Sequence, residues 1–122
     1  MSRHILLIDD DDSVRDILRR GLEEHGLRVS EATDGDKGLR HYRSDPADLV
    51  ICDIVMPNKE GLETLKELKE LPNAPKVMML SAGLHGNTVF LEIANMLGAD
   101  QVASKPVEWD VVWGKIQPLL GL

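Results

Sequence analysis

Three short runs of the sequence are apolar at every position, and a polar residue follows each run directly. The runs cover residues 5–8, 49–52 and 77–80. A strand is apolar on both sides only where both faces of its sheet are covered, which is typical of parallel sheets flanked by helices. The runs therefore predict central strands of a buried parallel sheet. Because the chain has 122 residues, we expect residues 1–122 to form one domain.

Apolar residues at helical spacing separate these runs, and two weaker strands are expected at residues 27–32 and 100–104. Five strands that alternate with five helices predict an α/β fold with a single doubly wound parallel sheet. The common strand order for such a chain is 2-1-3-4-5, the flavodoxin-like arrangement. Ser13, with Asp16 three residues later, resembles a capping box at the start of the first helix.

Composition limits the function classes. With 14 Lys and Arg residues against 21 Asp and Glu residues, the net charge is −7, so nucleic-acid binding by this domain is not expected. The single Cys52 excludes an internal disulfide and is compatible with a reducing compartment. No apolar run is long enough for a membrane span and no signal peptide opens the chain, so we expect a cytoplasmic protein that does not bind membranes.

Polar residues gather where predicted strands end. In an open parallel sheet, ligands bind at the carboxyl ends of strands where the strand order reverses, here between the first and third strands. Asp9, Asp10 and Asp53 follow these two strands. Three carboxylates in one pocket repel one another unless a divalent cation lies among them, and oxygen ligands suit Mg²⁺ or the similar Mn²⁺. Ser81 and Lys105, at two further strand ends, would complete a site for a phosphoryl group on an aspartate.

At this point the chain resembles the receiver domain of bacterial two-component response regulators, including chemotaxis regulators of this kind. The resemblance covers essentially the whole chain and lies in motifs at four strand ends. These are Asp9-Asp10, Asp53-Ile54-Val55-Met56-Pro57 with Gly61, Ser81-Ala82, and Lys105-Pro106. It implies a switch that is phosphorylated on Asp53 by a histidine kinase or phosphotransfer protein and then controls a downstream effector or a fused output domain. Because its phosphorylation and autodephosphorylation are self-directed, we do not classify it as an enzyme.

The resemblance also implies roles for single residues. Asp10 would bind Mg²⁺ directly, Asp9 mainly through water, and the backbone carbonyl of Val55 would be a further ligand. Lys105 would pair with the Asp53 carboxylate and later with the phosphoryl oxygens. Ser81 would move toward the phosphate, and the small Ala82 would leave access to it. The Lys105–Pro106 bond is expected to be cis.

Two departures from the family pattern matter. Receivers often have an aromatic switch residue three positions before the lysine, where this chain has Val102. Coupling between Ser81 and an aromatic residue is therefore doubtful, and the signal would travel through the loop around residues 83–86 and the fourth helix. The positions that often tune phosphate hydrolysis hold Val55 and Gly83, neither of which can orient a water, so we expect slow autodephosphorylation.

Other polar and aromatic residues have simpler interpretations. Asp11 and Asp12 are read as a solvated acidic turn without a site role. The histidines show no metal-ligand spacing and are expected at the surface; they are His4, His25, His41 and His85. Trp109 and Trp113 lie four residues apart on the last helix. They are either a partner or homodimer contact on the surface of the fourth helix, fifth strand and fifth helix, or ordinary packing at the edge of the core.

Three rival functions fit the sequence less well, and residues of the chain argue against each of them. A hydrolase of the haloacid dehalogenase type would need a second aspartate two residues after Asp53, where the chain has Val55. A flavin-binding redox carrier of the same topology would need a phosphate loop where residues 9–12 are all acidic. A docking domain that works without phosphorylation would not need the complete set of site residues.

Overall fold

The structure is a computed structural model and describes residues 3–56, 60–82 and 89–122. Five strands are present in this part of the chain: β1 (His4–Ile8), β2 (Arg28–Ala32), β3 (Leu49–Asp53), β4 (Lys76–Ala82) and β5 (Gln101–Lys105). The helices are α1 (Asp12–Glu24), α2 (Gly35–Ser44), α3 (Gly61–Glu70), α4 (Val89–Met96), α5 (Trp109–Ile116) and a short 3-10 helix, η1 (Pro118–Leu120). None of the helices in the described ranges is long and apolar enough to span a membrane.

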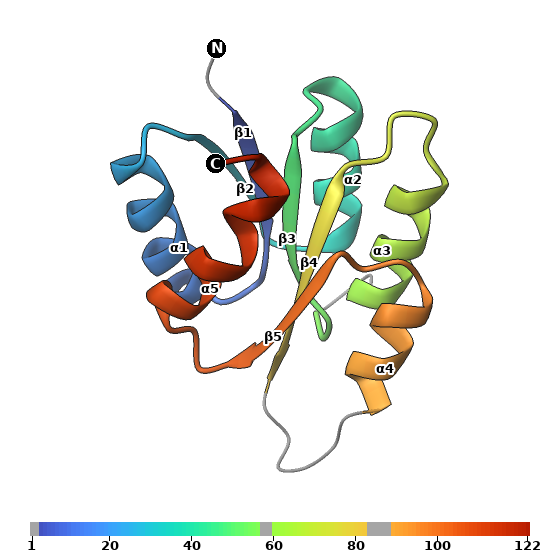
Figure 1. The fold of residues 1–122 in the computed structure, drawn as a ribbon. Helices are drawn as coiled ribbons and strands as arrows, with labels where there is room; N and C mark the ends of the chain where they lie inside the picture. Colours follow the sequence, from blue (N-terminus) through green and yellow to red (C-terminus); the bar gives the residue numbers. More distant parts are fainter. Residues whose placement is uncertain (1–2, 57–59, 83–88) are drawn as a thin grey trace.

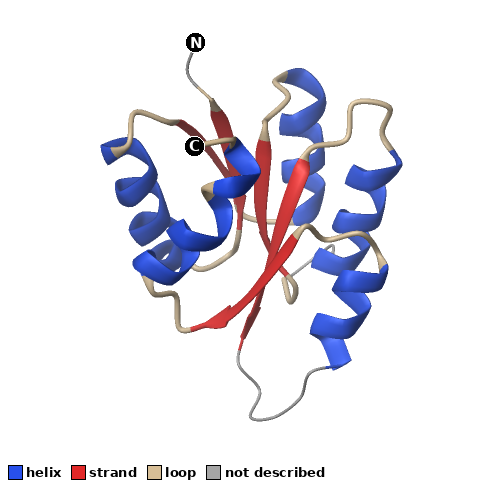
Figure 2. Cartoon of the chain, viewed as in Figure 1, coloured by secondary structure: helices blue, strands red, loops and turns tan. Residues whose placement is uncertain are grey.

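The strands form one parallel sheet in the order β2-β1-β3-β4-β5. Figures 1 and 2 show the sheet between two layers of helices, with α1 and α5 on one face and α2, α3 and α4 on the other. The predicted α/β class, strand order and doubly wound arrangement are confirmed. The order reverses at β1, so the crevice between the ends of β1 and β3 lies where the sequence predicted it.

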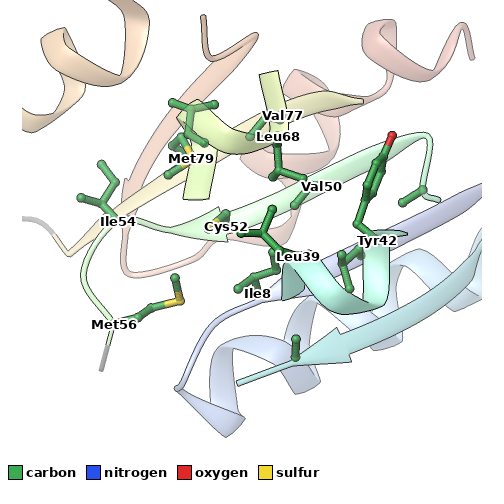
Figure 3. Packing of buried hydrophobic residues seen from close by; sticks show 14 of the residues in the cluster. Ile8, Leu39, Tyr42, Val50, Cys52, Ile54, Met56, Leu68, Val77 and Met79 are labelled. Carbon is green, nitrogen blue, oxygen red and sulfur yellow. The ribbon is translucent and has the colours of Figure 1, made fainter. Parts of the chain in front are cut away.

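The core has two halves because side chains alternate across each strand. On the face covered by α2 and α3, Leu6, Ile8, Val50 and Cys52 pack together, as Figure 3 shows for most of them. On the opposite face, alternate residues of the same strands contact α1 and α5; they are Ile5, Leu7, Leu49 and Ile51. All eight are at most 1% exposed, which explains why these strands are apolar at every position.

Two local expectations were wrong, the capping box at Ser13 and the surface position of His4. Asp11 caps α1 by accepting from the backbone N–H groups of Ser13 (2.9 Å) and Val14 (3.3 Å), so the capping box from Ser13 is not used. Asp11 is exposed at the start of the helix, as expected, and it also acts as the cap. His4 is buried, not on the surface, because its ring nitrogens lie 3.0 Å from the Pro46 carbonyl and 2.7 Å from Ser30 Oγ.

Candidate functional site

The acidic cluster begins directly after β1. The Asp9 N–H continues the sheet by donating to the Ala32 carbonyl at 3.1 Å, and Asp9 Oδ1 accepts from the Asp11 N–H at 2.9 Å. Asp9 and Asp53 are buried, whereas Asp10 is exposed. One carboxylate oxygen from each of these three residues lies within 4.8 Å of the other two. The structure therefore brings together the three carboxylates that the strand-end pattern selected.

Lys105, the last residue of β5, extends its ammonium group between two of these carboxylates. Its Nζ lies 3.1 Å from Asp9 Oδ2 and 3.2 Å from Asp53 Oδ2. The side chains of Asp9, Asp53 and Lys105 are 3%, 5% and 16% exposed, so solvent screens these charges weakly. With Asp10 included, three carboxylates share one ammonium among the residues that the structure describes, so these groups together carry excess negative charge.

The surroundings raise the pKa of both buried aspartates above its ordinary value. For Asp53 the main cause is burial, followed by the charge of Asp9, while Lys105 acts in the opposite direction. Burial also raises the pKa of Asp9, while the hydrogen bond from the Asp11 N–H and the charge of Lys105 lower it by less. Burial lowers the pKa of Lys105, but the hydrogen bonds and charges of Asp9 and Asp53 outweigh it, so the net direction is upward. A further positive charge would reduce the repulsion between the carboxylates in this pocket.

The donor set fits a hard divalent cation. Within the described part of the chain, Asp9 Oδ2 accepts no hydrogen bond of good geometry, although it is buried beside Lys105. Mg²⁺ binds through a few carboxylates and keeps several waters, and the exposed Asp10 leaves room for such waters. Asp9, Asp10 and Asp53 are thus the residues that could hold the ion.

A close approach of two chain segments positions Asp53. The Gly61 N–H at the start of α3 donates to the Ile54 carbonyl at 2.7 Å, and a Cβ on Gly61 would overlap the Asp53 carbonyl oxygen. The Ile54 N–H donates to the Leu80 carbonyl at 2.9 Å. Asp53 Oδ1 accepts from the Val55 N–H at 3.4 Å, and Val55 is 57% exposed.

The remaining predicted residues lie on β4 and β5. Ser81 is buried one residue beyond Leu80, the partner of Asp53 in the sheet register, and the Lys105–Pro106 bond is cis. Ala82 pairs with Lys105 in the backbone register. The side chain of Ala82 lies outside the described part, as do Pro57, Gly83 and His85. Val102 is half-buried beside a hollow of about 530 Å³ between β5 and α5.

The two tryptophans lie on the side of α5 that faces α1. The rings of Trp109 and Trp113 stack with their centroids 5.6 Å apart, and the His25 ring lies 4.1 Å from Trp113. Both indoles are half-buried, and Gly21 of α1 leaves room for Trp109, since a Cβ there would lie 2.5 Å from the indole. These contacts match the packing interpretation at the edge of the core.

Sequence reasoning missed one residue beside the pocket. Arg15 of α1 is buried and its Nη1 lies 3.4 Å from the Asp9 carbonyl oxygen, to which it donates. An arginine within a helix that also contains Arg19 and Arg20 looks like a solvated residue in the sequence. Its distance of six residues from Asp9 was the only available signal, and this is weak.

Comparisons with known proteins agree with this geometry. The family model described as the response regulator receiver domain matches residues 5–117. The transcriptional regulatory protein CpxR of Klebsiella pneumoniae is 34% identical over 95% of this chain and 48% of its own length. The chemotaxis protein CheY of Halobacterium salinarum is 32% identical over 98% of both chains. The chain spans about half the length of the regulators such as CpxR that it matches.

Solved structures give the same result. A CheY-like response regulator receiver domain protein from Methanospirillum hungatei is similar with a TM-score of 0.90 and 27% identity, over 99% of this chain and 95% of the other. The family match covers most of the chain, and the same region folds into the five-stranded sheet with its acidic pocket. The chain therefore belongs to the response regulator receiver domain family.

Proposed function

We propose that the chain is a phosphorylation-activated signalling switch in which Asp53 accepts a phosphoryl group in a Mg²⁺-dependent reaction. The donor would be a histidine kinase or a phosphotransfer protein, and the setting cytoplasmic. One observation supports this proposal above all others. Lys105 Nζ lies 3.1 Å from Asp9 and 3.2 Å from Asp53, in a buried pocket whose described residues include more carboxylates than cations. Such a pocket suits a bound cation and a nucleophilic carboxylate.

The transfer step follows from these groups. A carboxylate oxygen of Asp53 attacks the phosphorus atom of the donor phosphohistidine, and an oxygen–phosphorus bond forms. The phosphorus–nitrogen bond breaks, its electron pair stays on the donor imidazole, and the imidazole takes up a proton. The product is an acyl phosphate on Asp53. Ionised Asp53 is the reactive form, and the nearby Lys105 ammonium favours that form.

The neighbouring residues would stabilise the charge that develops on the phosphoryl oxygens. Lys105 is within reach of Asp53 and can pair with one of them, and the buried Ser81 can donate its hydroxyl after a short movement. A bound Mg²⁺ would neutralise further oxygen charge. Asp9, Asp10, Asp53 and the carbonyl of Val55 are the proposed ligands.

We infer that phosphorylation changes the α4–β5–α5 surface, and that this surface controls an effector protein or a fused output domain. Lys105 and Val102 both line the hollow between β5 and α5, so a shift of Lys105 toward a phosphate changes the wall of this surface. The Val102 side chain fills less of this hollow than an aromatic side chain would. The regulators that the chain resembles include transcriptional regulatory proteins, and a homodimer through this surface stays a prediction.

The first experiment is the intact mass after incubation with acetyl phosphate, with and without Mg²⁺. The wild-type protein is expected to gain one phosphoryl group only with Mg²⁺, and Asp53→Asn is expected to gain none. Absence of an adduct with both acetyl phosphate and phosphoramidate would leave a constitutive docking module. A colourless purified protein separates either case from a flavin carrier.

The same mass assay tests the lifetime of the phosphate. The exposed Val55 side chain cannot orient a water, so slow hydrolysis is expected. Val55→Asn is expected to lose the adduct faster than wild type, because an amide can hold a water by hydrogen bonds. An unchanged rate would contradict this assignment.

A further inference from the structure

Arg15 is unusual among the arginines of α1 because it is buried. Its side chain is 11% exposed, whereas the side chains of Arg19 and Arg20 are 38% and 74% exposed. Removing a guanidinium from water is costly unless hydrogen bonds and charges compensate for it. The partners of Arg15 therefore indicate what its burial achieves.

These partners belong to three different segments. Nη1 donates to the backbone carbonyl of Asp9 at 3.4 Å, and Nη2 donates to the Asp12 carboxylate. Nε lies 3.6 Å from Glu31 Oε1 on β2, yet makes no hydrogen bond of good geometry within the described residues. One side chain thus connects α1, the loop after β1 and strand β2.

Arg19 provides the natural comparison, since it lies one turn further along the same helix. It also pairs with Glu31, at 3.0 Å. Its other partners, Asp16 and Glu23, belong to α1 itself. Arg19 therefore connects α1 to β2, whereas Arg15 in addition holds the loop that bears Asp9 and Asp10.

That loop needs such support, because residues 9–12 are four consecutive aspartates that repel one another. The other hydrogen bonds that hold it include one from the Asp9 N–H to the Ala32 carbonyl, at 3.1 Å, and one from the Asp11 N–H to Asp9 Oδ1, at 2.9 Å. Arg15 adds a bond to the Asp9 carbonyl and a full positive charge beneath the loop. The guanidinium supplies donors in a rigid planar arrangement, which a lysine does not reproduce.

We propose that Arg15 is a positioning residue for the divalent cation site. It holds the backbone of residues 9–12 so that the Asp9 and Asp10 carboxylates already face Asp53 when the cation arrives. Arg15 itself contacts neither the cation nor the phosphoryl group. This inference rests on the proposed function, because it assumes that the acidic cluster binds Mg²⁺.

The test compares Arg15→Gln and Arg15→Lys with Arg19→Gln, which removes an arginine from Glu31 but leaves Asp9 untouched. Mg²⁺ alone is titrated into each folded protein by calorimetry. Removal of groups that orient metal ligands typically costs 10- to 100-fold in affinity, so about a tenfold loss is expected for Arg15→Gln. Arg15→Lys should fall between Arg15→Gln and wild type, and Arg19→Gln should stay within about twofold of wild type.

Amide hydrogen exchange in metal-free buffer provides an independent measurement. Exchange at residues 10–12 is expected to be faster in Arg15→Gln than in Arg19→Gln, at equal global stability. Wild-type Mg²⁺ affinity and unchanged exchange in Arg15→Gln would overturn the inference and leave the proposed function intact. Failure of the wild-type protein to bind Mg²⁺ would overturn both. If Arg15→Gln does not fold, the same two measurements on Arg15→Lys decide the question.

Discussion

Strand β5 has a lysine–aspartate contact at each end, and the two differ in charge balance. Before its first residue, Asp100 Oδ2 accepts from Lys69 Nζ at 2.6 Å and from the Val77 N–H at 2.8 Å. Lys69 Nζ also donates to the Pro75 carbonyl at 3.0 Å. At the other end of β5, Lys105 is shared between Asp9 and Asp53, with Asp10 close by.

The difference separates a structural contact from the contact that we propose to be part of a reactive site. In the Lys69–Asp100 pair one positive charge balances one negative charge, and both side chains have additional backbone partners. The pair joins α3 to the start of β4 and β5. In the Lys105 pocket the described carboxylates outnumber the described cations, and burial raises the pKa of Asp9 and Asp53. A buried charge that is fully compensated holds elements together, while one that is undercompensated is available to bind a cation or to react.

The largest expected effect is on stability, with opposite signs at the two ends. Asp100→Asn leaves Lys69 without its counter-ion and weakens the bond to the Val77 N–H, so we expect a loss of about 2 kcal/mol in the free energy of unfolding. Asp53→Asn removes a repelled carboxylate and should stabilise the metal-free protein by about 1 kcal/mol. Urea unfolding in EDTA measures both. If both substitutions changed the free energy of unfolding in the same direction, the contrast between the two lysine–aspartate contacts would be wrong.

The next effect concerns cation affinity. Lys105→Met removes the ammonium that lies against Asp9 and Asp53, so Mg²⁺ should bind about tenfold more tightly at pH 8. Lys69→Met is the matched control, because it removes a lysine from the balanced pair at the other end of β5. Calorimetric titration should give wild-type affinity for this control. Weaker binding by Lys105→Met would mean that the lysine organises the cation site more than it competes for it.

The smallest effect is a pH dependence. The folded-state pKa of Asp53 is raised, so on acidification the folded protein takes up a proton before the unfolded chain does. Below that raised pKa the cost of burying ionised Asp53 disappears. The stability advantage of Asp53→Asn over wild type should therefore be largest near neutral pH and shrink toward pH 4, a change below about 1 kcal/mol. Unfolding curves in EDTA at several pH values test the sign, and a growing advantage would contradict it.

Much of this molecule could be predicted because the signals are local. Uninterrupted apolar runs identify β1, β3 and β4, and alternation with helices leads to the strand order. The same rule brought Asp9, Asp10 and Asp53 to one crevice, where the structure has them. Their chemical roles follow from this placement as proposals.

For His4 and Arg15 the cause is the same, which is that partners in other elements of the fold decide whether the side chain is buried. His4 is buried because Ser30 and Pro46, 26 and 42 residues away, satisfy its ring. Arg15 is buried because it reaches Asp9 and Glu31 across elements. The choice of Asp11 over Ser13 as the cap of α1 was local, but several adjacent polar residues competed for the position and the pattern did not rank them.

Gly61 has a consequence for genetics. It has no side chain and no charge, yet any larger residue there would push against the carbonyl of Asp53. A screen for loss of signalling should therefore recover substitutions at position 61 together with changes at Asp53 and Lys105. Suppressors of a Gly61→Ala allele would be expected in the turn that follows β3, where small backbone shifts can restore the separation.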